Sequence, residues 1–400
     1  MLKRCLILSI VSISLNNLLT AQLSSFVDTT YFNENHVVKS IIHKIIQKPD
    51  TMNHGPALFF YPNGKLKQSG FYKNDQLDST WISYYPIGKI KRQVFYSNNL
   101  KNGSFTNYHE NGKVKNTGQY VNDSITGVMK LYFPNGILQE ERTYLCNKLN
   151  GITTGFDKYG VINFRFNYID SIPDGLYEKY YSNGKLKESG QVQKKDFYGE
   201  FKSYYESGSL ESECVFSGHN INGLYQVFYE GSTKKIICNY LNGKIEGSWI
   251  KFHPNGVAED SGTYNNGVQT GLWISRFDNG GINMIGQYNN GLPSGNWKVY
   301  FPNGNLKQEG IYLNGKSDGL WKFYHENGNV RSKGVFSEDK QQGHWVHFYP
   351  DGKVQLDLYY MDGKLNGILT GYDEVGEIIE QPEFVDNQLV RQIKGKPIKK

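Results

Sequence analysis

Residues 300–321 read YFPNGNLKQEGIYLNGKSDGLW, and the same arrangement of aromatic residues and glycines recurs every 24 residues along the 400-residue chain. The glycine after the first aromatic run holds one register, at Gly64, Gly88, Gly112, Gly136, Gly160, Gly184, Gly208, Gly256, Gly280, Gly304, Gly328, Gly352 and Gly376, with Gly231 one residue early. A second glycine series runs from Gly55 to Gly367, and only Ser79 departs from it. Aromatic residues recur four residues before the first glycine and eight after it, where Arg276 and Val192 are the respective exceptions. The chain is therefore built from about fourteen copies of one unit.

Each unit is predicted to form a β-hairpin. Asn and Gly stand together between two aromatic runs, as in Asn303-Gly304, and this pair is typical of a two-residue turn in which both residues have positive φ. Counting outward from such a turn places His325 opposite Val330 and Trp321 opposite Gly334. The polar stretch at residues 314–319 predicts a longer connection to the next hairpin.

The composition supports the same fold class. The chain contains 30 Tyr, 22 Phe, 6 Trp and 44 Gly, and aromatic residues favour strands while glycines favour turns. Because aromatic residues are paired with glycines across the hairpin, each ring is predicted to cover the exposed backbone of the glycine on the facing strand. We therefore expect an all-β chain, an elongated and twisted antiparallel sheet of tandem 24-residue hairpins, with little helix.

The unit quoted above resembles the MORN (membrane occupation and recognition nexus) repeat, over about residues 55–380. It is most similar to a bacterial variety described as the antitoxin component of toxin–antitoxin modules. The resemblance implies hairpins laid side by side and a role in interactions, with lipid contact in some eukaryotic members. It does not identify a partner.

The first residues have the features of an export signal. Lys3 and Arg4 precede a mostly apolar stretch at residues 5–19, and Ala21 is a small residue suited to cleavage. The alternative is a membrane anchor, which is disfavoured because the stretch is short for a span and contains Asn16 and Asn17. We expect residues 1–21 to be a signal peptide and the protein to reach the periplasm, the cell surface or the medium.

Both ends of the remaining chain depart from the repeat. Residues 22–54 are predicted to form an N-terminal cap, in which the spacing of Val38, Ile41, Ile42 and Ile45 fits a helix although β-branched residues favour strands. Residues 381–400 are predicted to be a basic C-terminal tail.

No enzyme or metal site is expected. Equivalent residues of successive hairpins lie about 9.6 Å apart, because two strand spacings separate them. Cys214 and Cys238 are therefore too far apart for a disulfide, and the histidines in one register (His109, His253 and His325) cannot share a metal. No paired carboxylates, nucleophile–base pair or phosphate-binding loop stands out, so the chain is predicted to be non-catalytic and to need no cofactor. The formal net charge of +6 is too dispersed to predict nucleic-acid binding.

A row of tryptophans is the candidate binding surface. Trp249, Trp273, Trp297, Trp321 and Trp345 share one register. Such rings can anchor a partner protein or stack on sugars, and the alternative is that they form the core of a thin fold. We expect a secreted interaction scaffold with a protein partner, and a glycan- or cell-wall-binding module or an antitoxin-like partner of a toxin as alternatives. Membrane lipid is not expected as a partner, and self-association of an open sheet is a further expectation.

Overall fold

A computed structural model describes residues 24–32, 36–47 and 49–394, and within these ranges it contains strands and turns but no helix. The part of the chain that is described therefore holds no helix able to cross a membrane. The chain divides into two compact units. The first runs to Asn150 and includes Lys158–Gly160, and the second comprises Gly151–Asp157 and the chain from Val161 onward. The all-β prediction is confirmed.

Both units are made of short strands joined in sequence. The first unit contains β1 (Ser25–Tyr31), β2 (Val38–Gln47), β3 (Asp50–Phe60), β4 (Leu66–Lys73), β5 (Gln76–Tyr84), β6 (Ile90–Ser97), β7 (Leu100–Tyr108), β8 (Val114–Val121), β9 (Ser124–Ile125), β10 (Gly127–Tyr132), β11 (Leu138–Leu145) and β12 (Lys148–Leu149). The second contains β13 (Gly151–Phe156), β14 (Ile162–Ile169), β15 (Ile172–Tyr180), β16 (Leu186–Gln193), β17 (Asp196–Tyr204), β18 (Leu210–Ser217), β19 (Asn220–Phe228), β20 (Lys234–Leu241), β21 (Lys244–Phe252), β22 (Ala258–Asn265), β23 (Val268–Arg276), β24 (Ile282–Asn289), β25 (Leu292–Tyr300), β26 (Leu306–Leu313), β27 (Lys316–Tyr324), β28 (Val330–Ser337), β29 (Lys340–Phe348), β30 (Val354–Met361), β31 (Lys364–Leu365), β32 (Gly367–Ile368), β33 (Thr370–Tyr372), β34 (Ile378–Glu380), β35 (Pro382–Val385) and β36 (Gln388–Gln392).

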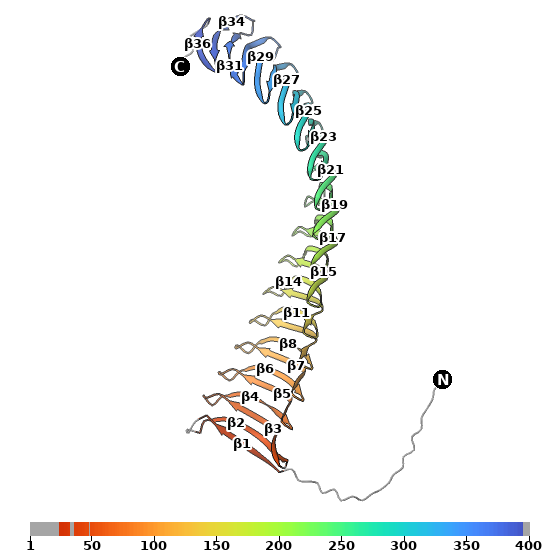
Figure 1. Ribbon diagram of the computed structural model, residues 1–400, viewed down its shortest axis with the longest axis vertical. Coiled ribbons are helices and arrows are strands. Elements are labelled where there is room, and N and C mark those ends of the chain that lie inside the picture. Colours follow the sequence, from red (N-terminus) through yellow and green to blue (C-terminus); the bar gives the residue numbers. More distant parts are fainter. Residues whose placement is uncertain (1–23, 33–35, 48, 395–400) are drawn as a thin grey trace, which may run out of the picture. The chain divides into compact units, whose positions relative to one another are not determined.

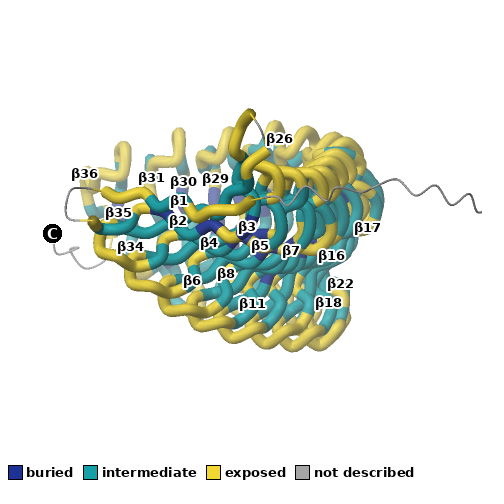
Figure 2. The backbone as a smooth tube through the Cα atoms, turned by 90° about the horizontal axis from the view of Figure 1, so that it is seen from below, coloured by how far each residue is buried: buried dark blue, intermediate teal, exposed yellow. Residues whose placement is uncertain are grey.

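Within each unit, strands joined by a turn pair antiparallel and the hairpins follow one another side by side (Figure 1). The short strands β9 and β10 both pair with β8. The short strands β32, β35 and β36 form a small separate sheet. The turns are exposed, and the buried residues lie along the middle of the strands (Figure 2).

The turn at each first glycine is a three-residue loop. The N–H of Gly328 donates to the carbonyl of His325 at 2.9 Å, and the N–H of His325 donates to the carbonyl of Asn329 at 2.8 Å. Gly328 has a φ of 93°, whereas Asn327 has no positive φ. These features define a type I turn followed by a bulge at the glycine. The predicted two-residue turn with two positive φ values is therefore wrong at this position.

The bulge also corrects the predicted pairing near the turn. Trp321 lies opposite Gly334 as predicted, but the register shifts between Phe323 and Tyr324. As a result Tyr324, and not His325, lies opposite Val330. The sequence contains a signal for this turn, since Pro302 and its equivalents occupy the second position of the four-residue turn, where proline favours type I.

The connection between hairpins is the tight two-residue turn. Asn314 and Gly315 have φ values of 50° and 83°, and Leu313 pairs directly with Lys316. Two consecutive positive φ values with a two-residue loop are the features of a type I′ turn. The longer connection predicted for residues 314–319 is therefore wrong. A second bulge follows at Gly319, whose φ is 70°, and the pairing shifts between Glu309 and Ile311.

The two end segments contain strands. The predicted N-terminal cap holds β1, β2 and the start of β3, so the residues with helical spacing lie in strand β2. The predicted tail contains β35 and β36, which are joined at Asp386-Asn387, 24 residues after the turn at Asp362-Gly363. All four of these turn residues have positive φ. The hairpin pattern thus continues to Gln392. The predicted signal peptide and residues 395–400 lie outside the described residues.

Candidate functional site

The tryptophan row forms the core of the sheet. Trp321 is 3% exposed and Trp345 is 2% exposed, Trp273 and Trp297 are also buried, and Trp249 is half-buried. Tyrosine rings pack edge-on between them, as where Tyr312 contacts Trp321 at a centroid distance of 5.1 Å and an angle of 86°. The five candidate residues are thus brought together in one row, but four of them offer no free ring face to a ligand.

The four buried indoles of the row each cover a glycine of the preceding repeat. A Cβ on Gly310 would lie 2.1 Å from the ring of Trp321, so only glycine fits there. The indole N–H of Trp321 donates to the carbonyl of Ile311 at 3.2 Å. Gly334, which lies opposite Trp321 in the sheet, is instead covered by Trp345. The predicted partnership of rings and glycines exists, but it joins neighbouring repeats as well as the strands of one hairpin.

In the second unit, near residue 153, the residue types in the tryptophan register and the glycine register are exchanged. Thr153 stands in the tryptophan register, and Phe166 stands opposite it in the glycine register. The exchange places a small side chain where a ring is usual and a ring where glycine is usual. Phe166 stacks on Tyr177 at a centroid distance of 5.0 Å and an angle of 13°. Tyr177 in turn meets Phe197 edge-on at 4.9 Å. These three rings are half-buried, so part of each ring faces solvent.

A hollow opens beside these rings. It is bounded by Phe166, Tyr177, Val192 and Phe197, together with Pro173 and neighbouring side chains of β14–β17. Val192 occupies the register in which the other repeats carry Tyr or Phe. The ring is supplied instead by Phe197 on the next strand, which packs edge-on against Tyr177 and Phe201 at a centroid distance of 4.9 Å from each. A space of about 230 Å³ remains beside these rings. We call this space the aromatic hollow.

Two lysines form the turn at the aromatic hollow. Lys194 and Lys195 have φ values of 50° and 83°, and Lys195 lines the hollow. The equivalent turns carry Asn, Asp, Gly, Ser, Cys, His or Glu, and Asn, Asp and Gly accept positive φ at the least cost. Within the described part of the chain, neither ammonium group has a carboxylate within ion-pairing distance. The turn therefore places two positive charges beside an apolar space, with the carboxylates of Asp174 and Asp196 next to it.

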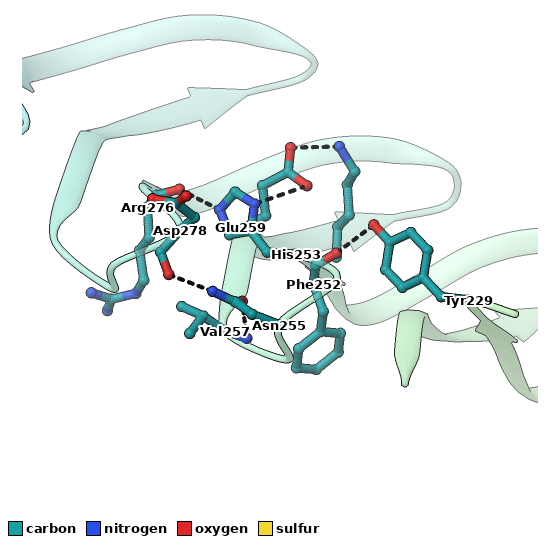
Figure 3. A network of polar contacts seen from close by, with 9 residues as sticks. Tyr229, Phe252, His253, Asn255, Val257, Glu259, Arg276 and Asp278 are labelled. Carbon is teal, nitrogen blue, oxygen red and sulfur yellow. Dashed lines mark hydrogen bonds and ion pairs between the residues drawn. The ribbon is translucent and has the colours of Figure 1, made fainter. Parts of the chain in front are cut away.

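Polar side chains link neighbouring repeats along the turns (Figure 3). The donors reach carbonyls 23 residues ahead: Tyr229 Oη to Phe252 at 2.9 Å, His253 Nε2 to Arg276 at 2.9 Å and Asn255 Nδ2 to Asp278 at 2.8 Å. Since a carbonyl only accepts hydrogen bonds, Nε2 of His253 carries a proton. His109 and His325 make the same contact. The shared register of these histidines is thus explained by a structural bond.

The remaining histidines and the cysteines lie apart. His344 pairs with Asp357 at 2.6 Å on the surface, and burial, followed by the charge of Arg331, lowers the pKa of His347. Cys146, Cys214 and Cys238 are free thiols, and burial raises the pKa of Cys214 and Cys238 to about 11. Within residues 24–32, 36–47 and 49–394, no three His, Cys, Asp or Glu side chains are grouped to hold a metal ion.

Comparison with protein families identifies the repeat. The model of the MORN repeat variant matches nine segments, at residues 53–74, 77–98, 101–122, 125–145, 173–194, 197–217, 293–314, 317–338 and 341–362. The chain is a MORN repeat protein. No curated protein matches it.

Solved structures of toxin complexes show a distant likeness to this MORN repeat protein. It aligns over 92% of its length with a crystal structure of TcdB2-TccC3 lacking its hypervariable C-terminal region, at 10% identity and a TM-score of 0.17. It also aligns over 92% of its length with a Photorhabdus luminescens Tc holotoxin pore, at 11% identity and a TM-score of 0.14. The chain spans about a quarter of those chains, 26% and 25% of their respective lengths.

Sequence reasoning on this MORN repeat protein missed the aromatic hollow. The break at Val192 is visible in the aromatic register, and Lys194-Lys195 is visible in the turn register. The exchange of Thr153 and Phe166 is visible as well, but only once the strand pairing is known. The family model leaves residues 146–172, which include Phe166 of the hollow, and residues 218–292 unmatched.

Proposed function

We propose that this MORN repeat protein is a non-catalytic scaffold for protein–protein interaction, exported from the cell that makes it. The supporting observation is a constant frame that carries variable exposed residues. Trp321, Gly310 and the turn residues are held fixed by packing, while the opposite face presents cross-strand pairs that differ between repeats. Repeat proteins use such surfaces to bind extended partners.

The exposed pairs are rich in apolar side chains in some repeats. Leu320 pairs with Val335, and the two are 50% and 41% exposed. The equivalent pair in the next repeat is His344 and Tyr359. Exposed apolar groups of this kind, set among charged neighbours such as Lys322 and Glu309, are typical of protein-binding surfaces.

Photo-crosslinking in the native host tests this proposal. Benzoylphenylalanine at Leu320 or Tyr359 is expected to yield discrete adducts with a protein. The same residue at Glu326, in an exposed turn, serves as the control for random collision. Equal adduct yields at all three positions, or adducts with glycan alone, would contradict the proposal.

The alternatives are less well supported. A glycan-binding role for the tryptophan row is disfavoured by the burial of four of the five rings. The antitoxin-like role and the export signal remain predictions from the sequence.

A further inference from the structure

We propose that three consecutive turns of the first unit bind an extended acidic segment of a partner protein, in which carboxylates recur at every third residue. The site is a row of six exposed lysines, which we call the lysine row: Lys65, Lys67, Lys89, Lys91, Lys113 and Lys115. The inference rests on the proposed scaffold function and names a partner class and a site for it.

The repeat places the lysine row along one edge of the sheet. Its members stand one and three residues after the glycine of each hairpin turn. The stem of the first lysine reaches towards the next repeat, since a Cβ on Gly88 would lie 3.9 Å from Cδ of Lys65. Nζ of Lys65 donates to the carbonyl of Ile87 at 3.1 Å, and Nζ of Lys113 donates to the carbonyl of Asn135. These side chains are already ordered, so they lose little freedom when a partner binds.

The positive charge of the lysine row is almost uncompensated. Residues 57–71, 81–95 and 105–119 form the three turns and the adjoining strands, and Glu110 is the one acidic residue among them. Within the described ranges of the chain, none of the six ammonium groups has a carboxylate within ion-pairing distance. In the second unit acids enter the same register, as at Glu259, which pairs with Lys251 at 2.6 Å. Such a concentration of one sign of charge favours an acidic partner.

The spacing of the lysine row matches one peptide conformation. Lysines of one register are separated by two strand spacings, about 9.6 Å. A polyproline II segment has three residues per turn and rises by about 9.3 Å per turn. Carboxylates at every third residue of such a segment therefore lie on one side, in step with the lysines of the three repeats.

Aromatic rings beside the ammonium groups favour a segment that also contains proline. Nζ of Lys67 lies 6.0 Å from the ring centroid of Tyr61, and Nζ of Lys91 lies 5.7 Å from that of Tyr85. Both tyrosines are half-buried, and each donates its hydroxyl group to a carbonyl of the next repeat. Proline-rich segments dock on fixed aromatic rings of this kind, and the adjacent ammonium groups can bind the carboxylates.

Fluorescence anisotropy of the full chain with a labelled peptide, GEPPEPPEPPG, tests the inference. Two control peptides separate the contributions: GQPPQPPQPPG lacks the charges, and GEEEPPPPPPG has the same composition with its carboxylates grouped. We expect saturable binding of the first peptide, at least tenfold weaker binding of the uncharged control and several-fold weaker binding of the grouped control. Added salt should weaken the binding, because exposed charges are screened.

A triple variant removes one lysine from each turn: Lys67→Gln, Lys91→Gln and Lys115→Gln. Gln139 and Gln355 occupy the same register in other repeats, so this variant should fold. The matched control removes the same charge in the same register of the second unit, where each lysine also lies over a ring: Lys187→Gln, Lys235→Gln and Lys307→Gln. These three lysines come from repeats that are not consecutive. We expect the first variant to weaken binding at least tenfold and the control to change it less than twofold.

The outcomes are distinct. An equal loss in the two triple variants would show that net charge alone matters, and would overturn the assignment to the lysine row. Failure of the wild-type chain to bind GEPPEPPEPPG would overturn the inference, and binding of duplex DNA or of anionic phospholipid vesicles instead would assign the row to another polyanion. In those cases, protein adducts from Leu320 in the crosslinking experiment would show that the scaffold function stands without it.

Discussion

Gly310 lies directly beneath the indole of Trp321, and a Cβ at this glycine would come within 2.1 Å of the ring. The contact crosses from one repeat to the next, and the same contact recurs between Gly286 and Trp297 and between Gly334 and Trp345. The row of rings and glycines therefore holds successive hairpins together, and each repeat depends on its neighbour.

Gly310→Ala is expected to destabilise the protein by about 1–3 kcal/mol, because the added methyl displaces a tightly packed ring. Gly231→Ala is the matched control, since a Cβ on Gly231 would meet no atom within 4 Å and this glycine has no positive φ. It should shift stability by less than about 0.5 kcal/mol. Urea unfolding followed by circular dichroism measures both, and equal shifts would refute the close contact.

The two asparagine-containing turns should respond oppositely to glycine. Asn314 has a φ of 50°, so Asn314→Gly relieves the backbone and should leave stability unchanged or slightly raised. Asn327 accepts from the N–H of Asn329 at 3.0 Å and donates to the carbonyl of Pro350 at 2.8 Å. Asn327→Gly loses both bonds and should cost roughly 1–2 kcal/mol. Thermal unfolding midpoints compare the two variants, and a greater loss for Asn314→Gly would contradict the turn assignment.

His253 is expected to be replaceable by tyrosine but not by phenylalanine. Tyr229 makes the equivalent bond in the preceding repeat, so His253→Tyr keeps a donor for the carbonyl of Arg276. His253→Phe leaves that carbonyl without its partner and should cost about 0.5–1.5 kcal/mol. Denaturant midpoints of the two variants provide the measurement. The account fails here if both variants lose the same stability.

The three cysteines should differ in reactivity. Burial raises the pKa of Cys214 and Cys238 to about 11, so about one thiol in a thousand is ionised at pH 8. Cys146 is exposed. Iodoacetamide at pH 8 should label Cys146 first, and the other two only after unfolding, as peptide mass spectrometry can establish. Labelling of all three at one rate in the folded protein would contradict their burial.

The fold could be predicted from the sequence because the same structural unit is repeated along the chain. Each register is sampled many times, so the pairing of Trp321 with Gly334 follows from counting and is confirmed. The turns were predicted less well, because Asn-Gly occurs both in the turn within a hairpin and in the turn between two hairpins, and it is compatible with either geometry. Pro302 distinguishes them, since proline cannot adopt the positive φ of a type I′ turn but fits the second position of a type I turn.

The candidate site was less predictable than the fold. A shared register for five tryptophans fits a surface and a core equally well, and only the burial of the rings distinguishes the two. At the aromatic hollow the ring has changed strands, since Phe197 lies opposite Val192 and packs against Tyr177 and Phe201. Breaks in a regular pattern are visible in the sequence, but their combined effect requires the pairing of the strands.

Acrylamide quenching of tryptophan fluorescence tests most directly the central claim that the tryptophan row is the core that carries the binding surface. Every tryptophan of the chain lies in this one register, and five of the six are buried. The account predicts weak quenching in the native protein and a several-fold rise on unfolding in guanidinium chloride. Native quenching as strong as that of the unfolded chain would contradict this account. It would mean that the tryptophan rings are exposed and available to bind a ligand.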